Sequence, residues 1–205
     1  MGGPAQAMWF IVSDPWYKRV DALIPAFIAI ILAETGERSQ MVAHRLGNAF
    51  ADHRKIYAAL IVATTANLLI GAVAGVMVAR VIGYDARTLF AALTLVFAGL
   101  PMLLAVKPRK PIAPKHPFFT SLIHFVPAQI AGAGPFIVGG LAARTGTIGF
   151  AFVGGFAAMI FSAALPLLLG DEWPGQLPLA ALRRIAALLL IGAGLWLGLS
   201  ALRLI

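Results

Sequence analysis

Six apolar segments of about 20 residues or more divide the chain, and they constrain its fold more than any other feature. An apolar helix of this length crosses a hydrocarbon core about 30 Å thick. Composition agrees, because 60% of the residues are hydrophobic and 12% are charged, whereas soluble domains are about 25% charged. The sequence therefore predicts an all-α integral membrane protein with six transmembrane helices. They are expected at Val20–Ala43, Ile56–Ile82, Ala86–Val106, Phe118–Ala143, Thr147–Leu169 and Leu179–Leu202.

A basic, proline-rich stretch at 107–117, "KPRKPIAPKHP", is predicted to be an extended linker between two halves of three spans each. The halves cover 20–106 and 118–205, and 1–19 precede them. Because each half has an odd number of spans, related halves would insert in opposite orientations, as in the inverted repeats of many transporters. "ILAETGERSQ" and "VPAQIAGAGP" lie near the same depth of the first and fourth segments, which aligns Glu34 with Gln129. We therefore expect two inverted three-helix repeats.

The formal net charge of +8 predicts a membrane orientation rather than a nucleic-acid partner. No basic patch is interleaved with aromatic residues, and Lys and Arg gather instead in the short connections between apolar segments. Nine of them fall on the side of the central linker and six on the opposite side. By the positive-inside rule we expect the linker in the cytoplasm and both termini, with the segment 1–19, outside a cell inner membrane.

The first apolar segment carries charges at a depth where they are costly. Only 12 apolar residues, Ala22 to Ala33, precede Glu34, and as a helix they cover roughly 18 Å of a core about 30 Å thick. The crossing must therefore include Glu34, Gly36, Glu37 and Arg38. Ionisable groups at this depth normally face the interior of a helix bundle or a wet cavity.

Helical spacing predicts how these groups are arranged. Glu34 and Glu37 would share one face, and Arg38 would neutralise Glu34 from the next turn. With Ser39 nearby, the carboxylates offer hard oxygen ligands for a divalent cation, and low dielectric favours a neutral carboxyl group, which allows exchange of a proton for a cation. Gly36 would permit a close neighbour or a local unwinding. The alternative is an ordinary helix end, with the Glu34–Arg38 pair among the lipid headgroups.

Further polar and glycine residues lie in the other segments. "GAGPF" at 132–136, with Gly132 and Gly134, predicts either a functional break in segment four or a kink for packing. Nearby His124 is interpreted as a hydrogen-bonded packing residue and Asn67 as an interhelical hydrogen-bonding residue. The remaining candidates are interpreted as intra-bundle contacts (Gly71, Gly75) and as a solvated loop (His44, Asp52, His53). Nothing resembles a catalytic set or a cofactor fingerprint, so we expect no enzyme.

The stretch "ETGERS" resembles the motif Glu–x–Gly–Asp–(Lys/Arg)–(Ser/Thr) of the two-repeat calcium/manganese cation–proton antiporters. That family includes Golgi, chloroplast and bacterial transporters and is grouped with the lysine-exporter superfamily. The resemblance implies six spans and one motif in each repeat, with both motifs meeting near the membrane centre to bind the cation. The residues that match the first motif, with Glu37 in place of the usual Asp, are Glu34, Gly36, Glu37, Arg38 and Ser39.

The second motif is degenerate in this chain. Gln129 keeps an oxygen ligand at the Glu position, but the following residues, 130–134, carry no acid, base or hydroxyl. The resemblance implies export of Mn²⁺ or Ca²⁺ in exchange for protons, without a permanent cofactor. Glu34 and Glu37 would then be the metal ligands and proton acceptors, Ser39 and Gln129 neutral ligands, and Arg38 the balancing charge. The alternatives are an exporter of an organic cation or amino acid, and a non-transporting membrane protein with the same fold.

Overall fold

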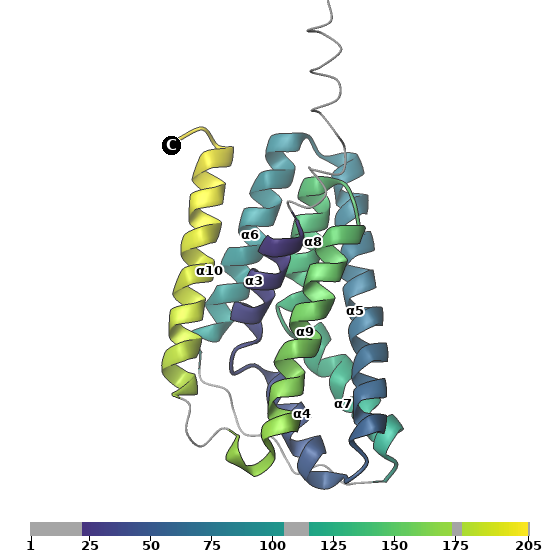
Figure 1. The fold of residues 1–205 in the computed structure, drawn as a ribbon. Coiled ribbons are helices and arrows are strands. Elements are labelled where there is room, and N and C mark those ends of the chain that lie inside the picture. The colour runs from purple at the N-terminus through teal and green to yellow at the C-terminus, as the bar shows by residue number, and fades with distance from the viewer. Residues whose placement is uncertain (1–21, 105–114, 174–177, 205) are drawn as a thin grey trace, which may run out of the picture.

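The computed structural model of the chain describes residues 22–104, 115–173 and 178–204, which form a bundle of helices (Figure 1). The predicted external segment 1–19 and most of the linker at 107–117 lie outside the described residues. The described residues contain eight α-helices and one short 3-10 helix, and no strand occurs among them. The helices are α3 (Leu23–Glu34), α4 (Arg38–Ala49), α5 (His53–Val81), α6 (Tyr84–Met102), α7 (Pro117–Ile130), α8 (Gly134–Thr145), α9 (Gly149–Leu169) and α10 (Leu179–Ala201), and the 3-10 helix is Gly170–Glu172.

Four of the described helices, α5, α6, α9 and α10, are long and apolar enough to cross a membrane. The pair α7 and α8 passes the same test together but is bent by 54°, so it adds a fifth span if it is counted as one. Helix α3 is apolar but shorter. The chain is therefore a multi-pass, all-helical membrane protein with four to five candidate spans among the described residues.

The segment expected at Val20–Ala43 is not one continuous helix, and of the two possibilities at Gly36 the chain adopts the local unwinding. Helix α3 ends at Glu34 and α4 begins at Arg38, because Gly36 adopts a φ of +68°, which interrupts a right-handed helix and favours glycine. The helical turn resumes and continues to Ala49, so His44 lies on α4 and not in the predicted loop. Segment four is also broken, between Ile130 and Gly134, as the "GAGPF" stretch predicted.

The helices of the second half begin at nearly constant distances from those of the first half. The starts of α3 and α7, Leu23 and Pro117, are 94 residues apart, and the starts of α4 and α8, Arg38 and Gly134, are 96 apart. The starts of α5 and α9 are also 96 residues apart, and those of α6 and α10 are 95 apart. Figure 1 shows that α3 and α4 run toward one end of the bundle, whereas α7 and α8 run toward the other.

The packing brings small residues to the contact between α5 and α8. A Cβ atom added to Gly71 or Gly75 would overlap the carbonyl oxygen of Pro135 or Gly139, respectively. The two backbones therefore touch, as is usual where small residues pack membrane helices together. The expected intra-bundle contact of Gly71 and Gly75 is confirmed.

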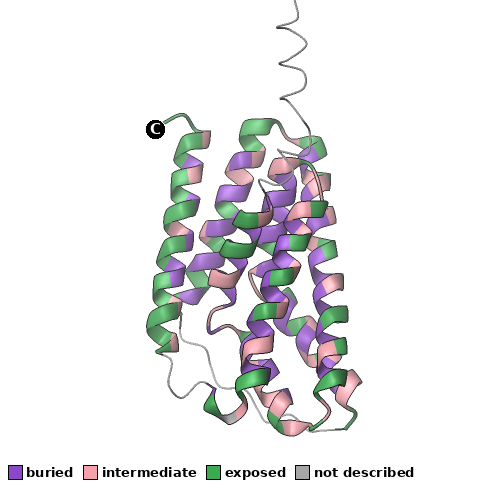
Figure 2. Cartoon of the chain, in the orientation of Figure 1, coloured by how far each residue is buried: buried purple, intermediate pink, exposed green. Residues whose placement is uncertain are grey.

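The buried and exposed faces follow the pattern of a membrane bundle (Figure 2). Large apolar side chains such as Ile123, Leu168 and Trp196 are exposed, which suits a surface in contact with lipid. Most of the buried side chains are small or apolar, and the buried polar ones include Glu34 and Gln129. Each of these two residues lies at the end of a half-length helix, next to a break.

Candidate functional site

The first break, residues 35–37, is held by two backbone bonds, from the Thr35 N–H to the Leu32 carbonyl and from the Glu37 N–H to the Glu34 carbonyl, and by side chains. The backbone N–H of Gly36 donates to Oε1 of Gln40 at 2.9 Å. In turn, Nε2 of Gln40 donates to Oγ of Ser162 on α9 at 2.7 Å. These two bonds attach the start of α4 to α9.

Glu34 is the last residue of α3 and is only 2% exposed. Its Oε2 accepts a hydrogen bond from the hydroxyl of Ser39. Its Oε1 lies 3.7 Å from a Cβ atom built on Gly134, the first residue of α8. The carboxylate of the first break is therefore next to the N-terminus of the helix that follows the second break, where the helix dipole favours negative charge.

Glu37 has a different partner. Its Oε1 accepts a hydrogen bond from the guanidinium of Arg183 on α10 at 3.0 Å, and the side chains are 13% and 11% exposed. Arg183 also donates to the carbonyl oxygens of Pro101, at 3.2 Å, and Leu104, at 2.9 Å. These carbonyls lie at the end of α6, whose dipole favours a cation there. Glu37 is thus compensated by a residue from the other half of the chain.

The predicted geometry on a single helix is wrong. Because the helix stops between Glu34 and Glu37, the two carboxylates do not share a helical face, and Arg38 does not reach Glu34. Arg38 is exposed and takes part in none of the ion pairs between described residues. The charge-balancing position beside the motif is occupied by Arg183 instead.

Gln129 lies one residue before the end of α7 and is 1% exposed. Its Nε2 donates to Oγ1 of Thr64 at 2.8 Å, and its Oε1 accepts from Nδ2 of Asn67 at 3.1 Å. The interhelical hydrogen bond expected of Asn67 is confirmed. His124, about two helical turns before the break, contacts the carbonyl oxygen of Thr120 through Nδ1 at 2.8 Å, as expected of a hydrogen-bonded packing residue.

A cavity of about 450 Å³, here called the central cavity, is lined by residues of both breaks. Glu37 comes from the first break, and Ala131, Gly132 and Ala133 form the second. The rest of the lining is mostly apolar and comes largely from α6. It consists of Phe90, Leu93, Thr94, Phe97, Ala98, Pro101 and Phe136.

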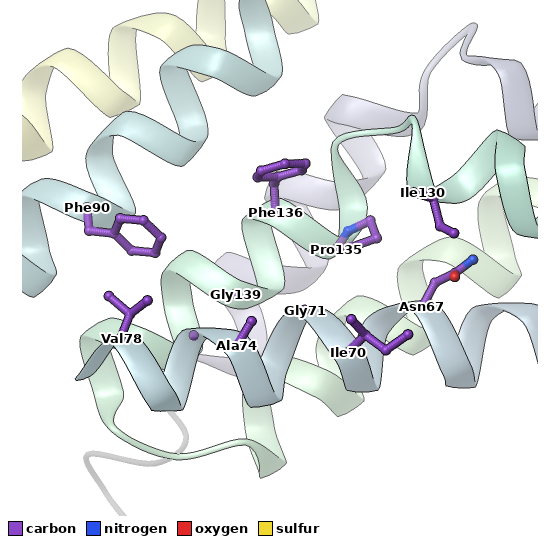
Figure 3. A pocket seen from close by; sticks show the side chains of 11 residues that line it. Asn67, Ile70, Gly71, Ala74, Val78, Phe90, Ile130, Pro135, Phe136 and Gly139 are labelled. Carbon is purple, nitrogen blue, oxygen red and sulfur yellow. The ribbon is translucent and has the colours of Figure 1, made fainter. Parts of the chain in front are cut away.

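A neighbouring cavity of about 320 Å³ shares Phe90 and Phe136 with the central cavity and extends along the contact between α5 and α8 (Figure 3). Asn67 lies at one end of this second cavity and is the only side chain with an amide among the residues that line it. Its lining is otherwise aliphatic, aromatic or glycine. The second cavity therefore offers apolar volume but no charged group.

The structure brings the two breaks together but not all of the predicted ligands. Among described residues, no side-chain hydrogen bond or ion pair joins Glu34, Glu37 and Gln129 to one another. Likewise, no cluster of three or more His, Asp or Glu side chains that could hold a metal occurs in the described part of the chain. A cation at Glu37 would have to displace the guanidinium of Arg183 or share the carboxylate with it.

Sequence reasoning missed the parts of Arg183, Gln40 and Ser162. Arg183 is one of the nine basic residues counted on the side of the linker. It lies inside the start of the sixth apolar segment, and this position is itself a signal of an interior role. Gln40 and Ser162 are recognisable as polar residues within apolar segments, but no sequence pattern pairs positions 122 residues apart.

Residues 22–110 match the family model described as Divalent cation/proton antiporter GDT1. The match covers the first half of the chain, including "ETGERS", and confirms the resemblance to the cation–proton antiporter family. This is a family of transporters and not of enzymes. No curated protein and no solved structure matches the chain.

Proposed function

With its first half matching the divalent cation/proton antiporters, the chain is, we propose, a secondary transporter that exports Mn²⁺ or Ca²⁺ in exchange for protons. The observation that carries the proposal is the meeting of two helix breaks at one cavity with a carboxylate in its lining. Broken membrane helices release backbone carbonyls and helix ends at mid-depth, which is where transporters bind ions.

Glu37 and Glu34 are the proposed ligands and proton acceptors. Glu37 lines the central cavity, and Glu34 is buried at the adjoining helix end. Carboxylate, hydroxyl and amide oxygens suit a hard divalent cation, so Ser39 and Gln129 are proposed as neutral ligands. Burial in low dielectric favours protonation of a carboxyl group without a cation, and this competition between proton and cation is the proposed basis of exchange.

We further propose that the two halves, 20–106 and 118–205, are inverted three-span repeats. The nearly constant distance between corresponding helix starts supports this arrangement, as does the opposite direction of the two broken pairs in Figure 1. From the distribution of Lys and Arg, the linker at 107–117 lies in the cytoplasm and both termini lie outside an inner membrane. One-sided labelling of a cysteine at Ala180 by an impermeant thiol reagent tests the orientation, and labelling only from outside would contradict it.

A second candidate is the export of an organic cation. The lining of the central cavity favours it, because Phe90, Phe97 and Phe136 offer aromatic faces to a cation and Glu37 is the single carboxylate there. The volume of about 450 Å³ also falls in the range of about 300–1,000 Å³ that small-molecule sites occupy. The same cavity would then use its apolar lining for the substrate's carbon atoms.

Flux into proteoliposomes under an imposed pH gradient tests the proposal. We expect the gradient to drive uptake of Mn²⁺ or Ca²⁺ by the wild type, and Glu37→Gln to abolish it. Asp85→Asn is the matched control, because Asp85 is an exposed carboxylate that pairs with Arg203 away from both breaks. Absence of divalent flux in folded wild-type protein would contradict the first candidate. A flux of an organic cation that is inhibited by excess of the same cation, and not by Mn²⁺, would support the second candidate.

A further inference from the structure

The ion pair between Glu37 and Arg183 lies at the boundary between two cavities. Glu37 and Pro101 line the central cavity. A separate cavity of about 340 Å³, here called the linker-side cavity, is lined by Arg183 and by Gly36, the neighbour of Glu37. It reaches Leu104, the last described residue before the linker at 107–117. The boundary therefore passes between Gly36 and Glu37 in the first break.

The same boundary passes between adjacent residues of α6, and Arg183 bridges it. Pro101 lines the central cavity, whereas Met102 lines the linker-side cavity. The guanidinium donates to Glu37 and to the Pro101 carbonyl on one side and to the Leu104 carbonyl on the other. One side chain thus joins the first break, α10 and the end of α6, at the point where a path between the cavities would run.

Two of the three guanidinium nitrogens of Arg183 donate hydrogen bonds, and the third does not. Its Nε is buried and has no acceptor among the described residues, although a guanidinium has five N–H donors to satisfy. Its other donors go to one carboxylate and two backbone carbonyls, and the carbonyls could keep the side chain anchored if the carboxylate left. The neighbouring Arg184 is exposed and forms no ion pair with another described residue.

We propose that Arg183 is a tethered cation, which occupies Glu37 when no substrate is bound and closes the passage between the central and linker-side cavities. This inference rests on the proposed function, because it names how access to the same site is controlled. One carboxylate in a mostly apolar lining cannot compensate both a guanidinium and a divalent cation. Binding of the cation therefore displaces Arg183, and displacement joins the cavities, so occupancy and access are coupled.

Cysteine accessibility tests the closure directly, because the native chain has no cysteine. Ala98→Cys reports on the central cavity and Ala180→Cys on the linker-side cavity. Each is placed in three backgrounds, wild type, Arg183→Gln and Glu37→Gln, and treated from the linker side with a water-soluble methanethiosulfonate reagent. The two substitutions remove the ion pair from opposite ends, so a folding defect in one leaves the other as a test.

We expect Ala98→Cys to react at least about tenfold faster in both substituted backgrounds than in the wild type, while Ala180→Cys reacts at one rate in all three. Equal rates for Ala98→Cys in all backgrounds would overturn the closure. Because labelling requires no transport, its result is independent of whether Mn²⁺ or Ca²⁺ flux is found.

Equilibrium titration with Mn²⁺ tests the competition. Arg183→Gln should bind Mn²⁺ about tenfold more tightly than the wild type, since the competing guanidinium is gone. Arg184→Gln is the matched control, because it removes an equal charge from the same linker-side cavity without touching Glu37, and its affinity should match the wild type. Unchanged or weaker binding by Arg183→Gln, with the wild type binding Mn²⁺, would overturn the role of Arg183. If the wild type transports neither Mn²⁺ nor Ca²⁺, the proposed function fails, and the labelling result still decides the closure.

Discussion

Two carboxylates only three positions apart have unrelated surroundings in this protein. Glu34 ends α3, accepts a hydrogen bond from Ser39 and is buried near the start of α8. Glu37 follows the left-handed Gly36 and pairs with Arg183 at the edge of the central cavity. The difference arises because the chain leaves the helix between them. The two carboxylates therefore have separate partners on different helices.

Substitutions of Gln129 test how far the degenerate second motif lowers the affinity for a divalent cation. In Gln129→Glu, the new carboxylate can still accept from Asn67, and the Thr64 hydroxyl can turn to donate to it. The added negative charge should lower the half-saturating Mn²⁺ concentration for transport about tenfold, or about 1.4 kcal/mol. Uptake kinetics in proteoliposomes measure this. Gln129→Met, which removes the ligand oxygen, should shift the value upward, and equal values for the two variants would contradict a ligand role for Gln129.

The burial of Glu34 could be predicted from residue counting, because too few apolar residues precede it for a crossing to end there and a carboxylate inside a crossing faces the bundle interior. Its neighbours could not be predicted in the same way. The partner of Glu37 is 146 residues away, and the fold alone brings the two together. Arg38 was assigned to Glu34 on the assumption of an unbroken helix, which the conformation of Gly36 removes.

At the scale of elements, the sequence predicts the second break more clearly than the first. The Gly–Ala–Gly–Pro sequence of segment four indicates a break directly, since Pro135 lacks a backbone donor and glycine has little helical preference. The first segment holds a single glycine, so unwinding there was only one of two possibilities. Tertiary contacts stabilise the unwound turn, because Gln40 accepts a hydrogen bond from the freed N–H of Gly36 and donates one to Ser162 on α9.

The contact of α5 with α8 supports the second break, and it gives a prediction of stability. Gly75→Ala should destabilise the protein by about 1–3 kcal/mol, because its Cβ would overlap the Gly139 carbonyl and force the helices apart. Thermal unfolding in detergent measures the effect as a lowered Tm.

Gly192→Ala is the control for that substitution, because a Cβ atom there meets nothing within 4 Å. Its helical position should make alanine neutral or stabilising by up to about 1 kcal/mol. If Gly75→Ala unfolded at the same temperature as Gly192→Ala, the close approach of α5 and α8 would not matter for stability.

For the whole molecule, hydropathy predicted most of the helices closely. Helices α5, α6, α9 and α10 lie within a few residues of the apolar segments expected for them, because a lipid-spanning helix must be both long and apolar. The even spacing of helix starts also agrees with two related halves. The alignment of Glu34 with Gln129 puts both at ends of half-helices, but only the folded chain shows that the breaks share a cavity.

In the proposed exchange, cation and proton use the same two breaks, so their coupling is a property of the whole molecule. The most direct measurement follows the pH inside proteoliposomes when Mn²⁺ is added outside, with no pH gradient imposed. For the wild type and Asp85→Asn we expect Mn²⁺ entry to be accompanied by proton exit and a rise in internal pH, and for Glu34→Gln we expect neither. An equal Mn²⁺-driven pH change in Glu34→Gln would contradict exchange through the carboxylates of the broken helices.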